Sequence, residues 1–146
     1  MKVLISTLPF TGSINLFQAF ATKLVTRDHQ VLWLTGENHK AAVEATGATF
    51  IPLSPDCLGV LSDPTPDSGT SGMAAGLSLM RKMFIDPIPC LVKQYGEILN
   101  KHGFDAEKDV LVVDLVNLPA LCLRDLGGPI YTSVGVVPLH TMVPEL

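Results

Sequence analysis

The chain has few cysteines, few aromatic residues and no long hydrophobic run. Its 146 residues include 3 cysteines, at Cys57, Cys90 and Cys122, and only 6% aromatic residues. Three widely spaced cysteines with no Cys-x-x-Cys pair suit neither a disulfide framework nor a zinc site. No apolar run reaches the roughly 18 residues that a membrane-spanning helix needs, and a strand-like segment follows Met1 directly, without a signal sequence. We therefore expect free thiols, no bound metal, no membrane span and a cytoplasmic location.

Clustered positive charge is missing as well. The sequence has 10 lysines and arginines against 14 aspartates and glutamates, which gives a formal net charge of -4. Nucleic-acid binding requires several basic side chains that neutralise phosphates, so we do not expect this class of partner. Glycine-rich phosphate loops are also missing, because Gly12 stands alone before the first expected helix. We accordingly expect no nucleotide cofactor.

Hydrophobic residues make up 47% of the chain and recur with the periods of alternating strands and helices. The pattern predicts five strands, at residues 2–6, 30–34, 48–53, 110–113 and 130–133. Helices are expected between them, at residues 16–24, 38–46, 73–84 and 90–101, with a further one at residues 118–126. Strands separated by helices indicate an α/β fold, a Rossmann-like doubly wound parallel sheet with flanking helices. The length fits a single domain covering residues 1–146.

Two local expectations concern the first helix and the longest connection. The helix at residues 16–24 is expected to begin after Ser13 as its N-cap. Its buried stripe should contain four apolar side chains, namely Leu16, Phe17, Phe20 and Leu24. Residues 54–72 are rich in proline, glycine, serine and aspartate, which predicts an irregular loop.

Ligands of open α/β sheets bind beyond the carboxyl ends of the strands, and the expected loops there hold few titratable groups. Asp114 closes the apolar strand at residues 110–113, where it either serves a ligand site or caps the following helix. Among the four histidines, His140 on the loop after the fifth strand is the best candidate for a general acid or base. His39 follows the second strand and is expected to begin a helix, while His29 and His102 suit structural positions.

Residues 9–15 read Pro-Phe-Thr-Gly-Ser-Ile-Asn after the first strand, and residues 27–31 read Arg-Asp-His-Gln-Val before the second. Further along, Asp114 follows the fourth strand, and Leu126-Gly127 precedes the fifth. This pattern resembles the opening of the GT-B glycosyltransferases of the UDP-glycosyltransferase family. In that family the residue after the glycine is a catalytic histidine, which an aspartate orients. Ser13 occupies the histidine position here, and Asp114 matches the aspartate.

The resemblance implies an acceptor-binding half-domain that recognises a hydrophobic small molecule. Its catalytic positions would be Ser13 and Asp114, with His140 as the substitute acid or base. Its substrate-binding positions would lie in the first loop and the adjoining turn, at Pro9, Phe10, Thr11, Gly12 and Asn15. Independently of the resemblance, Met80 and Phe84 of the helix at residues 73–84 are further candidates, because soft apolar side chains suit an apolar ligand. The family holds its sugar nucleotide in a separate C-terminal domain, so sugar transfer would require a donor-domain partner.

Three functions therefore stay open. The chain is an acceptor-binding domain of a glycosyltransferase, a stand-alone enzyme for a cofactor-free cyclisation or isomerisation of a secondary metabolite, or a non-catalytic binding protein. The unpaired edge of the strand at residues 130–133 predicts a homodimer or a docked partner, which would bury residues 134–138 and part of the helix at residues 118–126. The alternative is that residues 137–146 fold back and cover this edge in a monomer.

Overall fold

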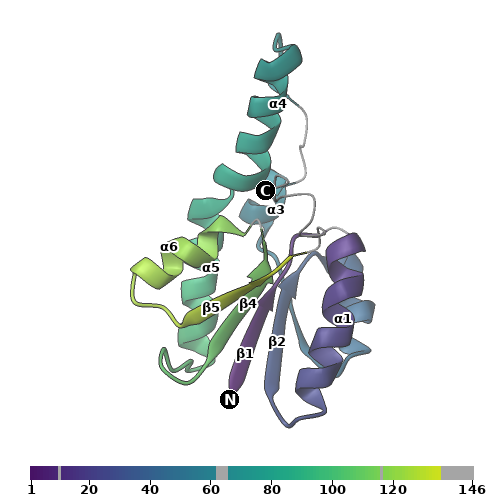
Figure 1. The fold of residues 1–146 in the computed structure, drawn as a ribbon, viewed down its shortest axis with the longest axis vertical. Coiled ribbons are helices and arrows are strands. Elements are labelled where there is room, and N and C mark those ends of the chain that lie inside the picture. Colours follow the sequence, from purple (N-terminus) through teal and green to yellow (C-terminus); the bar gives the residue numbers. More distant parts are fainter. Residues whose placement is uncertain (10, 62–65, 116, 136–146) are drawn as a thin grey trace, which may run out of the picture.

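The computed structural model describes residues 1–9, 11–61, 66–115 and 117–135. A 5-stranded parallel sheet with the order β3-β2-β1-β4-β5 runs through the centre of the chain (Figure 1). The strands are β1 Lys2–Ser6, β2 Gln30–Thr35, β3 Thr49–Pro52, β4 Val110–Asp114 and β5 Ile130–Val134. The helices are α1 Thr11–Val25, α2 Lys40–Glu44 after a short 3-10 turn η1 Glu37–His39, α3 Pro55–Leu61, α4 Gly72–Met80, α5 Ile88–Lys101 and α6 Leu118–Asp125. The α/β doubly wound fold expected from the sequence is confirmed.

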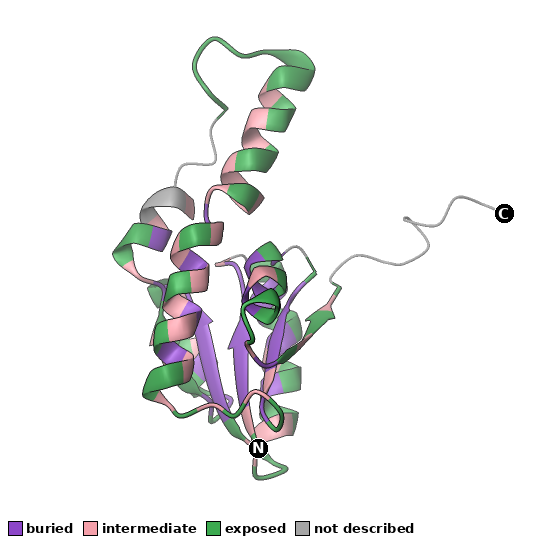
Figure 2. Cartoon of the chain, turned by 90° about the vertical axis from the view of Figure 1, so that its left-hand side faces the viewer, coloured by how far each residue is buried: buried purple, intermediate pink, exposed green. Residues whose placement is uncertain are grey.

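Helices cover both faces of the sheet, and alternate residues of each strand divide between two hydrophobic clusters. On one face, strand residues such as Leu4 and Leu111 pack with Tyr95 of α5 and with side chains of α3 and α6. On the other face, Ile5 and Trp33 pack with residues of α1 and α2. Figure 2 shows the central strands buried between these layers. Burial on both faces explains the continuous apolar runs of the central strands.

Helix α1 begins earlier than expected and turns a different stripe toward the sheet. It starts at Thr11, so Ser13 lies in the first helical turn, and the expectation of Ser13 as N-cap is wrong. The fully buried apolar residues of α1 are Ile14, Phe17 and Ala21. Leu16 and Phe20 are each 39% exposed, so the expected stripe is wrong at these two positions, whereas Phe17 is buried and the half-buried Leu24 packs against the cluster on this face. Apolar side chains lie all along this segment, and packing against Trp33, rather than hydrophobicity alone, selects the buried set.

The connection expected to be irregular at residues 54–72 contains helix α3. Proline suits the first helical position, where no partner for its missing N–H is needed, and Pro55 begins this helix. The Ser54 hydroxyl accepts a hydrogen bond from the Cys57 N–H at 3.3 Å, which caps the first turn. The loop expectation is therefore wrong for residues 55–61, while residues 66–71 contain no helix or strand.

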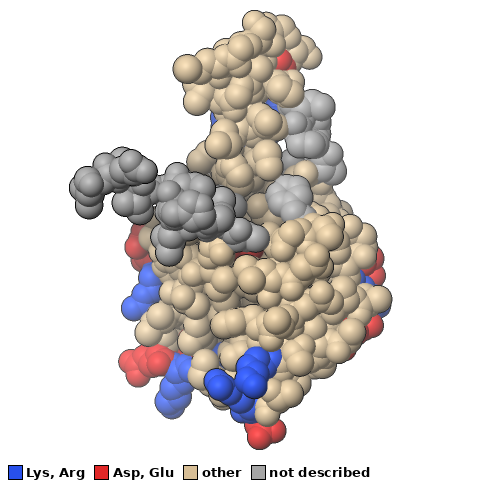
Figure 3. Space-filling view, turned by 45° about the vertical axis from the view of Figure 1, so that its right-hand side comes forward, with Lys and Arg blue, Asp and Glu red and all other residues tan. Residues whose placement is uncertain are grey.

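Helix α4 projects from the body of the domain beyond the carboxyl ends of the strands (Figure 1). None of its residues is buried, and its sequence, Gly-Met-Ala-Ala-Gly-Leu-Ser-Leu-Met, carries no charge. Met73 is 84% exposed, and Leu77 and Met80 are also mainly exposed. In the face shown in Figure 3, charged side chains gather at the end of the molecule opposite this projection. A five-residue π-helical segment, η2 Arg81–Ile85, joins α4 to the turn before α5.

Candidate functional site

The carboxyl ends of β1 and β4 meet at the switch point of the strand order, where ligands of such sheets bind. Ser6 ends β1, and Thr7 follows it on the opposite face, where the Thr7 hydroxyl accepts a hydrogen bond from Trp33 Nε1 at 3.0 Å. Asp114 ends β4 next to them. Its Oδ2 accepts a hydrogen bond from the Leu8 N–H at 2.9 Å. The β4 carboxylate thereby fixes the first loop directly after β1.

Asp114 is only 2% exposed, and its second oxygen is unsatisfied. Oδ1 has no hydrogen-bond partner within the described part of the chain. Burial raises the pKa of Asp114 above its ordinary value, while the Leu8 N–H and the Ser13 hydroxyl oppose this shift. Ser13 thus lies near enough to stabilise the charged carboxylate, although it makes no hydrogen bond of normal geometry to Oδ1. The structure brings together the two residues that the sequence pairs.

The alternative interpretation of Asp114, as a cap of helix α6, is wrong. Asn117 precedes α6, and no side-chain hydrogen bond caps this helix. The backbone carbonyl of Asp114 accepts the Asn117 N–H at 3.0 Å, but its carboxylate turns toward the first loop instead. The carboxylate is therefore free for a role at the sheet edge.

A second polar cluster lies on the other face of the same edge, and the sequence argument missed it. The Tyr95 hydroxyl hydrogen-bonds to the Ser6 hydroxyl at 2.8 Å and donates to Asn117 Oδ1 at 2.9 Å. Asn117 Nδ2 also approaches the Ser6 hydroxyl, at 3.5 Å. All three residues are buried, and burial raises the pKa of Tyr95. The only sequence signal was a tyrosine in the apolar stripe of α5, because a buried tyrosine hydroxyl needs a partner.

The other candidate residues surround this edge unevenly. Pro9 is half-buried, and its carbonyl lies 3.3 Å from His39 Nε2. Thr11, Gly12 and Asn15 are exposed on the first turns of α1. Gly36 packs against the first loop so closely that a Cβ there would lie 2.9 Å from Pro9 Cβ, which only glycine avoids. The loop before α1 and the turn after β2 therefore form one packed unit.

The remaining candidates are the two apolar residues near α4 and two that lie outside the described residues. Met80 is exposed at the end of α4, and Phe84 is half-buried in the π-helical segment. Phe10 and His140 fall outside the described residues, so their assignments stay sequence-based predictions. His102 follows the last turn of α5, as expected for a structural histidine.

The cysteines are free, as expected, but two of them are neighbours in space. Cys57 of α3 is buried, and Cys90 of α5 packs against the same hydrophobic cluster. Burial, together with the Cys57 thiol, raises the pKa of Cys90 to about 12. A thiol with such a pKa is almost entirely protonated near neutral pH, which disfavours Cys90 as a nucleophile.

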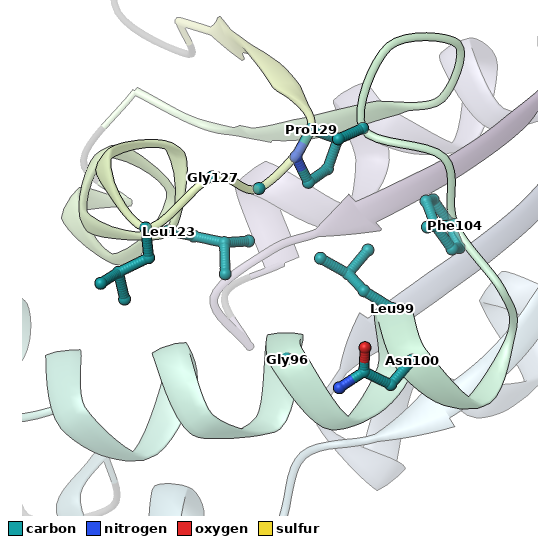
Figure 4. Close-up of a pocket in the computed structure, with 10 residues that line it drawn as sticks. Gly96, Leu99, Asn100, Phe104, Leu123, Gly127 and Pro129 are labelled. Atoms are coloured by element: carbon teal, nitrogen blue, oxygen red, sulfur yellow. The ribbon is translucent and has the colours of Figure 1, made fainter.

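A pocket of about 230 Å³ lies between α5, α6 and the loop before β5 (Figure 4). Leu99, Phe104 and Pro129 contribute to its lining, and the last two precede β4 and β5. The pocket therefore opens at the end of the sheet opposite Asp114. A smaller one of about 120 Å³ lies between α3 and α5 beside Cys90. Neither is lined by Ser13 or Asp114.

Two kinds of feature are absent from the described residues. Within them, no three His, Cys, Asp or Glu side chains are grouped closely enough to hold a metal ion. No helix formed by these residues has the length and apolar character required to cross a membrane.

Comparison with known proteins gave one curated relative and many structural neighbours. No family model matches the chain. It is 30% identical over 117 residues to 4'-demethylrebeccamycin synthase of Lentzea aerocolonigenes, an alignment that covers 77% of this chain and 27% of that protein. Among solved structures, the glycosyltransferase of kitacinnamycin superposes with a TM-score of 0.68 at 20% identity, covering 93% of this chain and 30% of that chain.

Two more solved glycosyltransferases have the same fold over most of this chain. The calicheamicin glycosyltransferase CalG4 gives a TM-score of 0.68 at 14% identity, over 97% of this chain and 35% of that one. The spinosyn rhamnosyltransferase SpnG, complexed with thymidine diphosphate, gives a TM-score of 0.60 at 18% identity, over 89% of this chain and 33% of that one. The chain spans about a third or less of the length of these proteins.

Proposed function

We propose that this chain, which has the fold of the N-terminal part of GT-B glycosyltransferases and is similar to one of them in sequence, is an acceptor-binding domain for a hydrophobic small molecule. The observation that carries the proposal is the buried Asp114 carboxylate. It lies at the switch point of the sheet, beside Ser13, with one oxygen unsatisfied. A mostly apolar surface with a few fixed polar groups is the usual composition of a small-molecule site.

The apolar part of the site would come from the segment between β3 and α5. Met80 and Phe84 belong to this segment, and methionine adapts readily to apolar ligands. The first loop and the start of α1 would supply the opposite wall, with Pro9, Phe10, Thr11, Gly12 and Asn15. Ser13, Asp114 and His140 would be the catalytic positions.

We propose that this chain takes part in sugar transfer only when it acts together with a donor-binding partner domain. The chain covers about a third or less of the length of the glycosyltransferases described above, and SpnG was solved in complex with thymidine diphosphate. We propose that the isolated chain binds the acceptor and does not bind the nucleotide sugar. A donor domain, supplied by a partner, would close the site.

A cofactor-free enzyme is the second candidate, and the same carboxylate favours it. A buried aspartate with a raised pKa is a stronger base than a solvated one, and proton transfer alone can drive a cyclisation or an isomerisation. Turnover of a secondary metabolite by the isolated chain, without any sugar donor, would favour this candidate. Ligand binding without turnover under either condition would favour a non-catalytic binding protein.

The proposed assembly involves the outer surface of α6 and β5, which we call the α6–β5 face. β5 is an edge strand of the described sheet, and its Ile130 is exposed. Leu118 and Leu121 of α6 also expose their side chains. We propose that a second copy of the chain, or the donor-domain partner, covers this face. A cytoplasmic location likewise remains a proposal.

An NMR titration of the isotope-labelled chain tests acceptor binding. We expect 1-naphthol to bind saturably and to shift the amide signals of Gly12, Asn15 and Gly36 at the carboxyl edge. The amides of Gly103 and Gly128 at the opposite end should not move, and they serve as the internal control. UDP-glucose should give no saturable shift at millimolar concentration. A saturable UDP-glucose isotherm, or naphthol shifts confined to Gly128, would overturn the proposal.

A further inference from the structure

The pocket between α5, α6 and the loop before β5, which we call the α5–α6 pocket, has an uncharged lining. Its apolar side chains are Leu99, Phe104, Ala106, Leu123, Leu126 and Pro129. Three glycines and Asn100 complete the lining, and none of these described residues carries a charge. A charged group that enters an apolar site without a partner loses its hydration at high cost. A ligand that fits this pocket is therefore neutral.

Gly96 leaves space on the α5 side of the pocket. It lies in the interior of α5, on the part of the helix that borders the pocket (Figure 4), and glycine weakens a helix relative to alanine. A Cβ added at Gly96 would meet nothing within 4 Å. Packing therefore gives no reason for the missing side chain. Its absence instead enlarges the space that a ligand can occupy.

The opposite wall is fixed by two glycines that the backbone requires. Gly127 has a φ of 85°, and a Cβ at Gly128 would lie 2.7 Å from the Leu123 carbonyl oxygen. The Gly128 N–H donates to this carbonyl oxygen at 3.0 Å, and the Gly128 carbonyl accepts from Arg124 Nη1 at 2.8 Å. These bonds hold the loop against the end of α6. The wall is thus formed before a ligand arrives, which lowers the cost of binding.

Asn100 supplies the polar side chain of the lining, and its hydrogen-bonding groups are unused. Its carboxamide lies beside Leu99 at the α5 edge of the pocket (Figure 4) and makes no hydrogen bond to any other described residue. A carboxamide presents N–H donors and an oxygen acceptor side by side. The complementary edge is a cis amide, whose N–H and carbonyl also lie side by side, as in a lactam. A single hydroxyl, such as that of 1-naphthol, cannot form two parallel bonds of this kind.

We propose that the α5–α6 pocket binds a compact neutral lactam, with its amide edge on the Asn100 carboxamide and its apolar ring over Gly96. The ligand N–H donates to Asn100 Oδ1, and the ligand carbonyl accepts from Asn100 Nδ2. A cavity of about 150 Å³ with an apolar lining holds a benzene ring, so a pocket of about 230 Å³ holds one ring together with its amide. The pocket lies at the end of the sheet opposite Asp114, and the inference does not rest on the proposed function.

Two matched ring compounds test the proposal by NMR titration of the isotope-labelled chain. ε-Caprolactam carries the amide edge, whereas an ester oxygen replaces the N–H in ε-caprolactone. We expect caprolactam at millimolar concentration to shift the amide signals of Gly96 and Gly128 saturably. The amides of Gly12 and Gly36 at the carboxyl edge should not move. One neutral hydrogen bond changes affinity by about 3- to 10-fold, and we expect caprolactam to bind more tightly than caprolactone by this factor.

Three variants, each checked for folding by circular dichroism, separate pocket binding from surface binding. Gly96→Leu should fill the pocket and weaken caprolactam binding by more than about tenfold, while the helix is kept because leucine is a better helix former than glycine. Gly76→Leu is the matched control, because Gly76 of α4 is also a helical glycine whose added Cβ would meet nothing within 4 Å. It should leave binding unchanged. Asn100→Leu should remove the preference for caprolactam over caprolactone.

Three results would overturn the lactam site. They are the absence of a saturable shift at Gly96 and Gly128 in the natural chain, equal binding of the two compounds by the natural chain, and undiminished binding by Gly96→Leu. Each of them would leave the proposed acceptor domain standing, because that proposal is read from the amides of the carboxyl edge.

Discussion

Replacing Tyr95 by phenylalanine tests whether the buried polar cluster at the sheet edge stabilises the fold. The hydroxyl makes bonds of 2.8 Å to Ser6 and 2.9 Å to Asn117, and the tyrosine ring is fully buried. Without the hydroxyl, Asn117 Oδ1 loses its donor inside the protein. Ser6 keeps only the long 3.5 Å contact with Asn117 Nδ2. One orphaned buried acceptor costs about 1–3 kcal/mol, because the desolvation of that atom is no longer compensated.

Urea unfolding, followed by the fluorescence of the single tryptophan, Trp33, measures this loss. Tyr95→Phe should lower the free energy of unfolding by about 1–3 kcal/mol, which for a chain of this size lowers the melting temperature by roughly 4 °C per kcal/mol. The matched control is Tyr131→Phe, because the Tyr131 hydroxyl makes no hydrogen bond within the part of the chain that the structure describes. If both variants differ from the natural chain by less than about 0.5 kcal/mol, the cluster does not hold α5 to the sheet edge and the reasoning is refuted.

Two other predictions concern assembly and acid stability. If the α6–β5 face carries a dimer contact, sedimentation at low micromolar concentration should show a dimer that Leu121→Glu dissociates, and a monomer with slowly exchanging β5 amides would contradict it. Burial raises the pKa of Asp114 in the native state above its ordinary value of 3.8. At a pH between the ordinary pKa and the raised pKa, the native state therefore binds a proton that the unfolded chain does not, and the stability that this proton contributes is lost as the pH rises through the window. Urea unfolding should show that the free energy of unfolding changes less favourably from pH 4 to pH 7 in the natural chain than in Asp114→Asn. Equal changes in the two proteins would refute the raised pKa.

The fold could be predicted from the sequence because its signals are local and repeated. Five apolar segments with helices between them leave little choice other than a parallel sheet, and each strand lies within a residue or two of its expected position. The start of α1 and its buried stripe could not be predicted, because apolar residues lie on several sides of the helix. Helix α3 was hidden by its composition, since proline and serine favour loops and helix starts equally.

The site was partly predictable for a similar reason. Asp114 stood out as a charged residue that ends an apolar strand, and its pairing with Ser13 was implied by the resemblance to the glycosyltransferase family. The Ser6, Tyr95 and Asn117 cluster joins residues up to 111 positions apart, and only the packing of α5 against the sheet brings them together. The free oxygen of Asp114 was equally invisible, because an unsatisfied atom is a property of three-dimensional packing.

The isolation of helix α4 from the core has an evolutionary consequence. Most substitutions in a domain are constrained by the folding equilibrium, since marginal stability leaves few kcal/mol to lose. Helix α4 contributes no buried side chain, so changes at positions such as Met73 or Leu77 leave that equilibrium nearly untouched. Selection can therefore alter the chemistry of this projection one residue at a time, without compensating mutations elsewhere. The scaffold around Tyr95 has no such freedom, and the two parts of one small domain can diverge at different rates.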